Sequence, residues 1–331
     1  MTRKILFAAA LLFAGQRIHA QDFHLSQYDA MPLYYNPAQT GMYFGSSDDM
    51  KFRLCGSYRS QWQKLQGKPY SSVGISYDMP IQRWGVGVLM MDHIAGTSNF
   101  GTFQFLLSGA YRITSDDSKK HFLSAGIQLG LFQKRFAYDN LLFESQYTPV
   151  DGLNPYLPNE EAFDRLGIIR FDANVGIYYK YLDPNRKFDP AFGFSIYHLT
   201  TPNESFTGEK ARLPMRFNFT GACDIHANED FTITPNVLFM YQRAAMEINA
   251  GLMFGYIMPD SPYDLLAGAS YRYKDGVVVH LGMKQGNNIF RVSYDIVTSP
   301  LYRFSGRRGG FEMGVIYSGA PKNGSHARAN L

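Results

Sequence analysis

The strongest constraint on the fold is a two-residue alternation of apolar and polar side chains that recurs along the chain. Between residues 121 and 132, Leu123, Ile127 and Leu129 fall on one face, and glycine, serine and glutamine fall on the other. Residues 216–225 and 289–296 repeat the pattern, with phenylalanine and tyrosine on the apolar face. Successive side chains of a strand point to opposite faces, so this period of two predicts an all-β fold.

The polar face of these segments distinguishes between two all-β architectures. An exported sandwich would have a charged outer face, whereas here the second face carries mainly glycine, serine, asparagine and glutamine. Phenylalanine (26) and tyrosine (23) are frequent, and many tyrosines lie near the ends of the segments. This pattern favours a barrel with lipid outside, a polar lumen and aromatic girdles at the membrane interfaces. The barrel must close, because open strand edges would leave backbone groups unpaired in hydrocarbon.

Fourteen segments carry the alternation, and bacterial single-chain barrels have an even number of strands. We therefore predict a single transmembrane up-and-down β-barrel of about 14 antiparallel strands in the outer membrane, formed by residues 52–317. The expected strands are 52–58, 71–78, 85–91, 101–112, 121–134, 169–180, 189–198, 214–225, 231–241, 246–256, 263–272, 277–285, 288–296 and 310–317.

The lengths of the connections predict an orientation. If the first strand starts on the periplasmic side, the long connections 59–70, 135–168, 199–213 and 297–309 all lie outside. Outer-membrane barrels have short periplasmic turns and longer outer loops. Two short connections, at 242–245 and 273–276, would also lie outside and do not fit the rule.

The longest connection, 135–168, is the candidate partner-binding loop. Connections of this length without regular structure are usually functional. Aromatic and proline residues in it favour a packed loop over a disordered one, and those we select are Tyr147, Pro149, Pro155, Tyr156 and Pro158.

The first twenty residues are typical of a secretory signal peptide. Arg3 and Lys4 precede an apolar run that is too short to span a bilayer, and Ala20 offers a small residue for cleavage. An uncleaved signal anchor is the alternative. The leader holds three of the 32 basic residues, so the mature chain has 29 basic and 28 acidic residues. This balance gives no argument for nucleic acid as a partner.

Residues 21–51 form an irregular segment between the leader and the first strand. Pro32 and Pro37 interrupt both helix and strand patterns. The segment is expected to begin on the periplasmic side, from where it either plugs the lumen or faces the periplasm. We favour the plug, because Tyr28, Tyr34 and Tyr35 would otherwise expose apolar surface to water. Residues 318–331 are expected to form a mobile tail.

No motif in the sequence predicts an enzyme, a cofactor site or a metal site. A nucleophile elbow, a glycine-rich phosphate loop and a metalloprotease helix are all missing, and no acid–histidine set converges. Cys55 and Cys223 lie far apart in predicted strands, and we expect two buried thiols rather than a disulfide.

Two motifs carry a resemblance to a known family. The segment QDFHLSQYDAMPLYYNPAQTG, with its Asn36, Pro37, Ala38 and Gly41, is similar to the mature N-terminus of the PorP/SprF outer-membrane proteins. The second motif lies at the end of the first strand and consists of Tyr58, Arg59, Gln61 and Trp62. Further matches extend across the mature chain to Gly310-Phe311-Glu312.

The resemblance implies a non-enzymatic component of the type IX protein secretion and gliding machinery of Bacteroidetes. Partners implied by it are outer-membrane lipid, a PorK/PorN-like ring, a PorE-like peptidoglycan-linked protein, or a secreted adhesin cargo. The eight motif residues would have a structural or docking role. The alternative function is a channel for apolar small molecules of the fatty-acid-transporter type, which a plugged barrel of this size would also suit.

Overall fold

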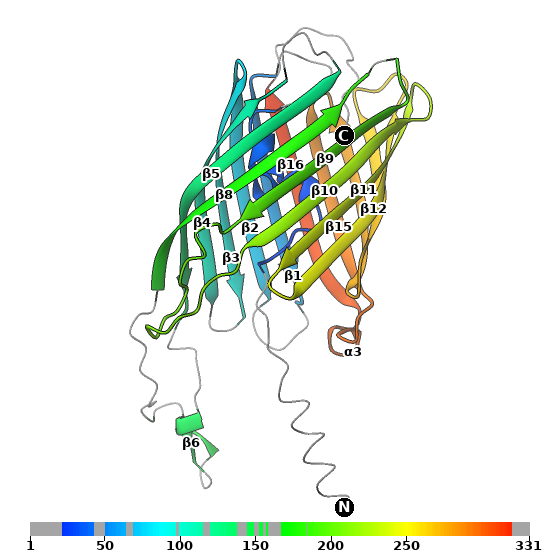
Figure 1. The fold of residues 1–331 in the computed structure, drawn as a ribbon. Helices are drawn as coiled ribbons and strands as arrows, with labels where there is room; N and C mark the ends of the chain where they lie inside the picture. The colour runs from blue at the N-terminus through cyan, green and yellow to red at the C-terminus, as the bar shows by residue number, and fades with distance from the viewer. Residues whose placement is uncertain are drawn as a thin grey trace, which may run out of the picture.

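In the computed structural model, the chain forms one closed barrel of tilted strands (Figure 1). The structure describes residues 22–42, 50–63, 69–96, 99–114, 120–137, 144–148, 152–154, 157, 167–183 and 185–319. The predicted leader 1–20 and residues 320–331 of the predicted tail lie outside the described residues, whereas Ser318 and Gly319, also predicted to be tail, belong to the last strand. Within the described part of the chain, no helix is long and apolar enough to cross a membrane.

Fourteen antiparallel strands make the wall, and each pairs with its neighbours in sequence until β16 pairs with β1. This confirms the predicted up-and-down barrel. The strands are β1 (Phe52–Gln61), β2 (Tyr70–Ile81), β3 (Trp84–Ala95), β4 (Phe100–Arg112), β5 (His121–Arg135), β8 (Gly167–Tyr181), β9 (Phe188–Tyr197), β10 (Arg216–His226), β11 (Phe231–Gln242), β12 (Ala245–Ile257), β13 (Asp264–Arg272), β14 (Gly276–Gln285), β15 (Asn288–Val297) and β16 (Arg308–Gly319).

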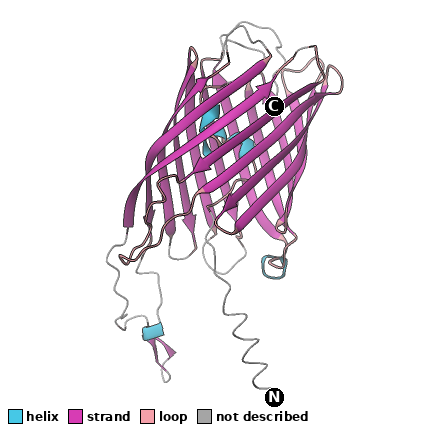
Figure 2. Ribbon diagram, viewed as in Figure 1, coloured by secondary structure: helices cyan, strands magenta, loops and turns pink. Residues whose placement is uncertain are grey.

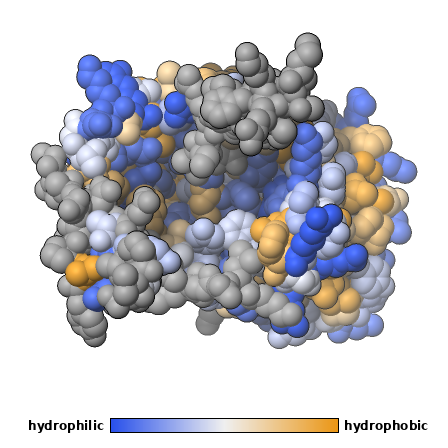
Figure 3. Space-filling model, turned by 90° about the horizontal axis from the view of Figure 1, so that it is seen from below, coloured by the Kyte–Doolittle hydropathy of each residue, from blue (hydrophilic) through white to orange (hydrophobic). Residues whose placement is uncertain are grey.

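The alternation of side chains sorts them between the outside and the lumen. On β15, Phe290, Val292 and Tyr294 are exposed on the outer wall, whereas Arg291 and Asp295 are buried inside. Hydrophilic residues accordingly lie within the ring when the barrel is seen along its axis, and hydrophobic residues lie on the outer wall at one side (Figure 3). An apolar outer band around a polar interior is the arrangement of a membrane-spanning barrel.

The two ends of the barrel differ in their connections. At one end, which we call the turn end, connections such as 82–83 and 286–287 are only two residues long. The opposite end, the loop end, carries the connection 136–166 and the connection 298–307 with the short helix α3 (Tyr302–Ser305). A small ribbon of β6 (Tyr147–Thr148) and β7 (Gly152–Leu153), with the 3-10 helix η4 (Glu144–Gln146), lies within 136–166.

Residues 22–42 lie inside the barrel (Figure 2). They form three short turns: η1 (Tyr28–Ala30), α2 (Pro32–Tyr35) and η2 (Pro37–Gln39). Leu25, Met31, Leu33 and Tyr35 are almost completely buried, and they pack against Leu89, Met91 and Leu238 of the wall. This segment, which we call the plug, therefore supplies the apolar core that the polar lumen lacks.

The outward position of Leu281 at the middle of β14 provides a test of the membrane face. Its side chain is 58% exposed. We expect Leu281→Arg to lower the free energy of unfolding in lipid vesicles by about 2–4 kcal/mol, the cost of a cation at the bilayer midplane. Val277→Arg, near the end of the same strand, should cost at most about 1 kcal/mol. Equal costs for the two variants would contradict this placement of the bilayer.

Candidate functional site

The plug runs through the lumen from the loop end to the turn end. The backbone N–H of Asp22 donates to Oε1 of Gln242, the last residue of β11, over 2.7 Å. At the other end of the plug, the N–H of Gly41 donates to Oδ2 of Asp78 on β2 over 2.6 Å, close to the 82–83 turn. We expected the segment to begin at the end of the barrel where the first strand starts, and this expectation is wrong. The plug begins at the loop end and crosses the lumen to the turn end, where β1 starts.

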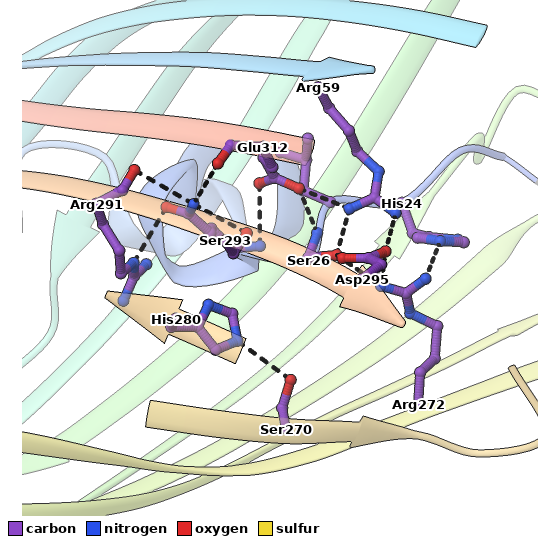
Figure 4. A network of polar contacts seen from close by, with 12 residues as sticks. His24, Ser26, Arg59, Ser270, Arg272, His280, Arg291, Ser293, Asp295 and Glu312 are labelled. Atoms are coloured by element: carbon purple, nitrogen blue, oxygen red, sulfur yellow. Dashed lines mark hydrogen bonds and ion pairs between the residues drawn. The ribbon is translucent and has the colours of Figure 1, made fainter. Parts of the chain in front are cut away.

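A fully buried arginine lies at the centre of the contact between plug and wall (Figure 4). Arg59 of β1 donates from Nη2 to Oδ2 of Asp295 over 2.6 Å and from Nη1 to Oε2 of Glu312 over 2.8 Å. It also donates to Oγ of Ser26 in the plug. The Ser26 hydroxyl in turn donates to Oδ1 of Asp295 over 2.8 Å. Both carboxylates are buried, and a buried carboxylate is costly without an ion-pair partner such as this arginine.

The plug backbone takes part in this ion cluster as well. The carboxylate of Glu312 accepts from the N–H of Ser26 over 2.7 Å and from the N–H of Gln27 over 3.0 Å. Arg272 of β13 donates to Asp295 over 3.1 Å and to Ser26 over 2.6 Å. Arg291 of β15 donates to Asp29 of the plug over 2.5 Å. Three arginines of the wall therefore hold residues 26–29, and charge-assisted bonds of this kind are stronger than neutral ones.

A histidine holds the plug at the loop end. Nε2 of His198 lies 2.6 Å from Oδ2 of Asp22, and Nδ1 lies 2.8 Å from Oδ2 of Asp172. Arg216 donates to Asp22 over 3.1 Å and to the carbonyl oxygen of Tyr34 over 3.2 Å. The sequence did not predict this acid–histidine set. Asp22 precedes Asp172 by 150 residues and His198 by 176 residues, and the three lie on different parts of the fold.

We call the contacts of His198 with Asp22 and Asp172 the latch. Burial and neighbouring charges act in opposite directions on the pKa values of His198 and Asp22. Burial lowers the pKa of His198, but the carboxylates of Asp22 and Asp172 outweigh it and raise the pKa to about 9. Burial likewise disfavours the charged carboxylate of Asp22, but His198 and Arg216 hold its pKa well below the usual range. At neutral pH the pair is therefore an imidazolium and a carboxylate.

The Asn36-Pro37-Ala38 motif binds the wall near the turn end. Nδ2 of Asn36 donates to the carbonyl oxygen of Ile177 over 2.8 Å, and its Oδ1 accepts from the N–H of Ala38 over 2.9 Å. Ser124 Oγ donates to the carbonyl oxygen of Ala38 over 2.7 Å. A side chain at Gly126 or Gly176 would collide with this motif, since its Cβ would lie 2.4 Å from the Pro37 carbonyl oxygen or 2.1 Å from Asn36 Oδ1.

A cavity of about 240 Å³ remains between the plug and the wall. Tyr28, Tyr35 and Met42 line it from the plug, and Lys180 and Lys284 line it from the wall. Asn287 and Ser318 place it towards the turn end. The plug therefore fills only part of the lumen cross-section at this depth.

The eight predicted motif residues occupy different environments. Asn36, Pro37, Ala38 and Gly41 lie in the plug, Arg59 binds Ser26 of the plug, and Gln61 is buried on the same strand as Arg59. Tyr58 faces outward from β1 with 42% of its side chain exposed, and Trp62 packs on Tyr70 with ring centroids 4.8 Å apart. Six of the eight residues therefore lie inside the barrel, four of them near the turn end and two near the loop end of β1, whereas Tyr58 and Trp62 belong to the outer wall and its rim.

The predicted partner-binding loop is only partly described. Tyr147 lies in β6 and is 62% exposed. Pro149, Pro155, Tyr156 and Pro158 lie outside the described residues. Among the residues that are described, no group of histidine, cysteine and acidic side chains could hold a metal ion. Cys55 is buried, Cys223 is partly exposed, and both are free.

Sequence comparison identifies the family. The model of the type IX secretion system membrane protein PorP/SprF matches residues 18–317. The chain belongs to the PorP/SprF family. No curated protein sequence matches this PorP/SprF chain.

Solved structures resemble this PorP/SprF protein in fold. The monoaromatic hydrocarbon channel CymD is 13% identical with a TM-score of 0.50, over 88% of this chain and 92% of that one. The toluene transporter TodX of Pseudomonas putida is 11% identical with a TM-score of 0.52, over 89% of this chain and 93% of that one. At these identities the likeness extends to the barrel architecture alone.

The ion cluster makes Arg59 the most sensitive single position for stability. We expect Arg59→Met to lower the free energy of unfolding by about 3–5 kcal/mol, because buried Glu312 would lose its arginine and Asp295 would keep only Arg272. Arg186→Met is the matched control, since Arg186 is exposed and lies 4.0 Å from Asp183. Denaturant unfolding in detergent micelles measures both, and a control as damaging as Arg59→Met would contradict the assignment.

The latch should make stability fall as the pH rises. The pKa of His198 is about 9 in the folded chain against 6.5 for an ordinary histidine. Its contribution is therefore complete below about pH 6.5 and is lost as the pH passes through about 9. We expect the wild type to lose roughly 2–3 kcal/mol between pH 6 and pH 10 from this group, and His198→Gln to lose correspondingly less. Parallel pH profiles for the two proteins would contradict the latch.

Proposed function

We propose that this protein is a non-enzymatic outer-membrane barrel that docks or anchors a component of type IX secretion. The component would be a secreted adhesin cargo, a PorK/PorN-like ring or a PorE-like peptidoglycan-linked protein. The observation that carries the proposal is the plug. A lumen crossed by a buried, charge-anchored segment suits a fixed platform better than an open pore.

The two ends of the barrel offer different surfaces for docking. We assign the loop end to the cell exterior, because outer-membrane barrels place their longer connections there. Tyr147 and the connection around it would then meet an exported partner. The turn end, where the cavity between plug and wall lies, would face the periplasm and its machinery.

His198 and its two carboxylate partners have no catalytic role in this proposal. His198 lies between two carboxylates, which is an arrangement found in hydrolases. Here, however, Asp22 belongs to the plug itself, His198 joins it to Asp172 of the wall, and Arg216 binds both Asp22 and the carbonyl oxygen of Tyr34 in the plug. We therefore assign the set to anchoring the plug, with no cofactor.

One observation favours a second function, a channel for apolar small molecules. Tyrosine and methionine of the plug line the cavity opposite two lysines of the wall, and the fold resembles that of hydrocarbon channels. Passage would require the plug to move, which would break several buried ion pairs.

Surface display of cargo in cells tests the first function. We expect a deletion strain to lose surface display, the wild-type gene to restore it, and a gene lacking residues 22–42 to fail although its barrel reaches the outer membrane. Normal display in the deletion strain would contradict the docking role. Arg186→Met serves as a control for full rescue, since it leaves the plug untouched.

Conductance in planar bilayers tests the second function. We expect the full chain to give little or no steady current, and the variant lacking residues 22–42 to give open-channel currents. A full chain that conducts stably, or that takes up an aromatic hydrocarbon in liposomes, would favour the channel.

A further inference from the structure

A cluster of exposed basic and aromatic side chains lies at the loop end beside α3. We call it the basic patch, and it consists of Lys274, Tyr302, Arg303, Phe304, Arg307 and Arg308. Phe304 is 75% exposed, the highest value among the large apolar side chains that the structure describes. Together with the exposed Tyr302, it gives this part of the rim an aromatic surface of the kind found at membrane interfaces.

The backbone fixes the position of the patch on the rim. The N–H groups of Thr298 and Ser299 donate to the carbonyl oxygen of Asp275 over 2.9 and 3.0 Å, so the 298–307 connection is tied to the β13–β14 turn. The turn of α3 closes with the N–H of Gly306 donating to the carbonyl oxygen of Tyr302 over 3.0 Å. Lys274 therefore lies on the turn to which the α3 connection is attached.

The positive charge of the patch is not neutralised by the protein. Arg303 and Arg307 lie over the ring of Tyr302 at 6.0 and 5.9 Å, and Lys274 lies over the ring of Tyr273 at 5.2 Å. In the described part of the chain, the nearby carboxylate of Asp275 is engaged by Arg272 over 2.7 Å, and no carboxylate pairs with the four cations of the patch. Four exposed cations therefore share one side of the rim.

The outward-facing wall of the barrel begins next to the patch. Tyr271, Tyr294 and Phe311 face outward near the loop ends of β13, β15 and β16, each about two-fifths exposed or more. Aromatic rings at strand ends mark the level of lipid headgroups. The patch is consequently at the height where phosphates of a lipid layer lie, and Phe304 can enter the acyl region beside it.

We propose that the basic patch binds the phosphorylated headgroup of an outer-leaflet glycolipid of the lipid A type. Arginine guanidinium groups bind phosphate oxygens in a bidentate manner, and three exposed arginines lie within four residues of the exposed Phe304 in the sequence. The choice of the outer leaflet rests on the proposed assignment of the loop end to the exterior. The binding itself is independent of secretion, so failure of one proposal leaves the other standing.

Binding of purified lipid A to the full chain in detergent micelles tests the proposal. The test variant is Arg303→Gln/Arg307→Gln/Arg308→Gln, and the matched control is Arg186→Gln/Lys187→Gln/Lys210→Gln, three exposed cations elsewhere. Each charge near an anionic lipid surface is worth roughly fivefold in affinity, so the test variant should bind on the order of one hundredfold more weakly. The control should bind within about twofold of wild type.

Three further arms define the ligand. Lipid A stripped of its phosphates should bind as weakly to wild type as lipid A does to the triple variant. Inorganic phosphate should not compete at millimolar concentration, since Phe304 and the acyl chains also contribute, and Phe304→Ala should weaken lipid A binding. Equal binding by the triple variant and its control, or a preference for phosphatidylglycerol over lipid A, would overturn the proposal. Folding of each variant is checked by the shift in its mobility on gel electrophoresis when the sample is heated. A triple variant that shows no shift is replaced by the single Arg307→Gln variant.

Discussion

The structure depends on one buried cation, Arg59, between the carboxylates of Asp295 and Glu312. Arg59 lies directly opposite Glu312 in the register of β1 and β16, the two strands that close the barrel. Ser26 and Gln27 of the plug donate to the Glu312 carboxylate through their backbone N–H groups. Leaving any member of such a buried set without its partner is costly. Closure of the barrel and placement of the plug are therefore energetically coupled at one site.

This coupling explains how a polar lumen is stabilised without a conventional core. Inward side chains of the wall are mostly polar or charged, and the plug brings leucine, methionine and tyrosine to cover Leu89, Met91 and Leu238. The same segment is held at the loop end by His198 and Arg216 and near the turn end by Asp78 and Ser124. Since the anchors lie along its whole length, the plug behaves as part of the barrel, which is what a docking platform requires.

Much of the barrel could be predicted from the sequence because strand periodicity is local. The alternation in 288–296 placed Arg291 and Asp295 on the polar face, and fourteen strands follow from repeating that inference. The ends of strands were less predictable. Asp92 and His93, for example, belong to β3, which runs on to Ala95 because it keeps pairing with β4.

The interior site was harder to predict because its members are distant in sequence. Arg59 was singled out through a family motif, but its partners Asp295 and Glu312 are more than 230 residues away, as the closing strands must be in a barrel. Periodicity also carries no information about the direction in which an irregular segment crosses the lumen. That direction is set by Asp22 and Gly41 at its two ends, which bind opposite rims.

A disulfide between plug and wall would test the central claim most directly. A Cβ at Gly314 of β16 would lie 3.2 Å from the Cβ of Ala30, a few tenths of an ångström short of the usual disulfide spacing, and 2.5 Å from Oε1 of Gln27, so a small shift of the Gln27 side chain accompanies the cross-link. In a chain with Cys55→Ala and Cys223→Ala, we predict that Ala30→Cys/Gly314→Cys cross-links in isolated outer membranes. Ala30→Cys/Gly56→Cys should not, since Gly56 has open space around it. Absence of the first cross-link, or equal formation of both, would contradict a plug fixed inside the barrel.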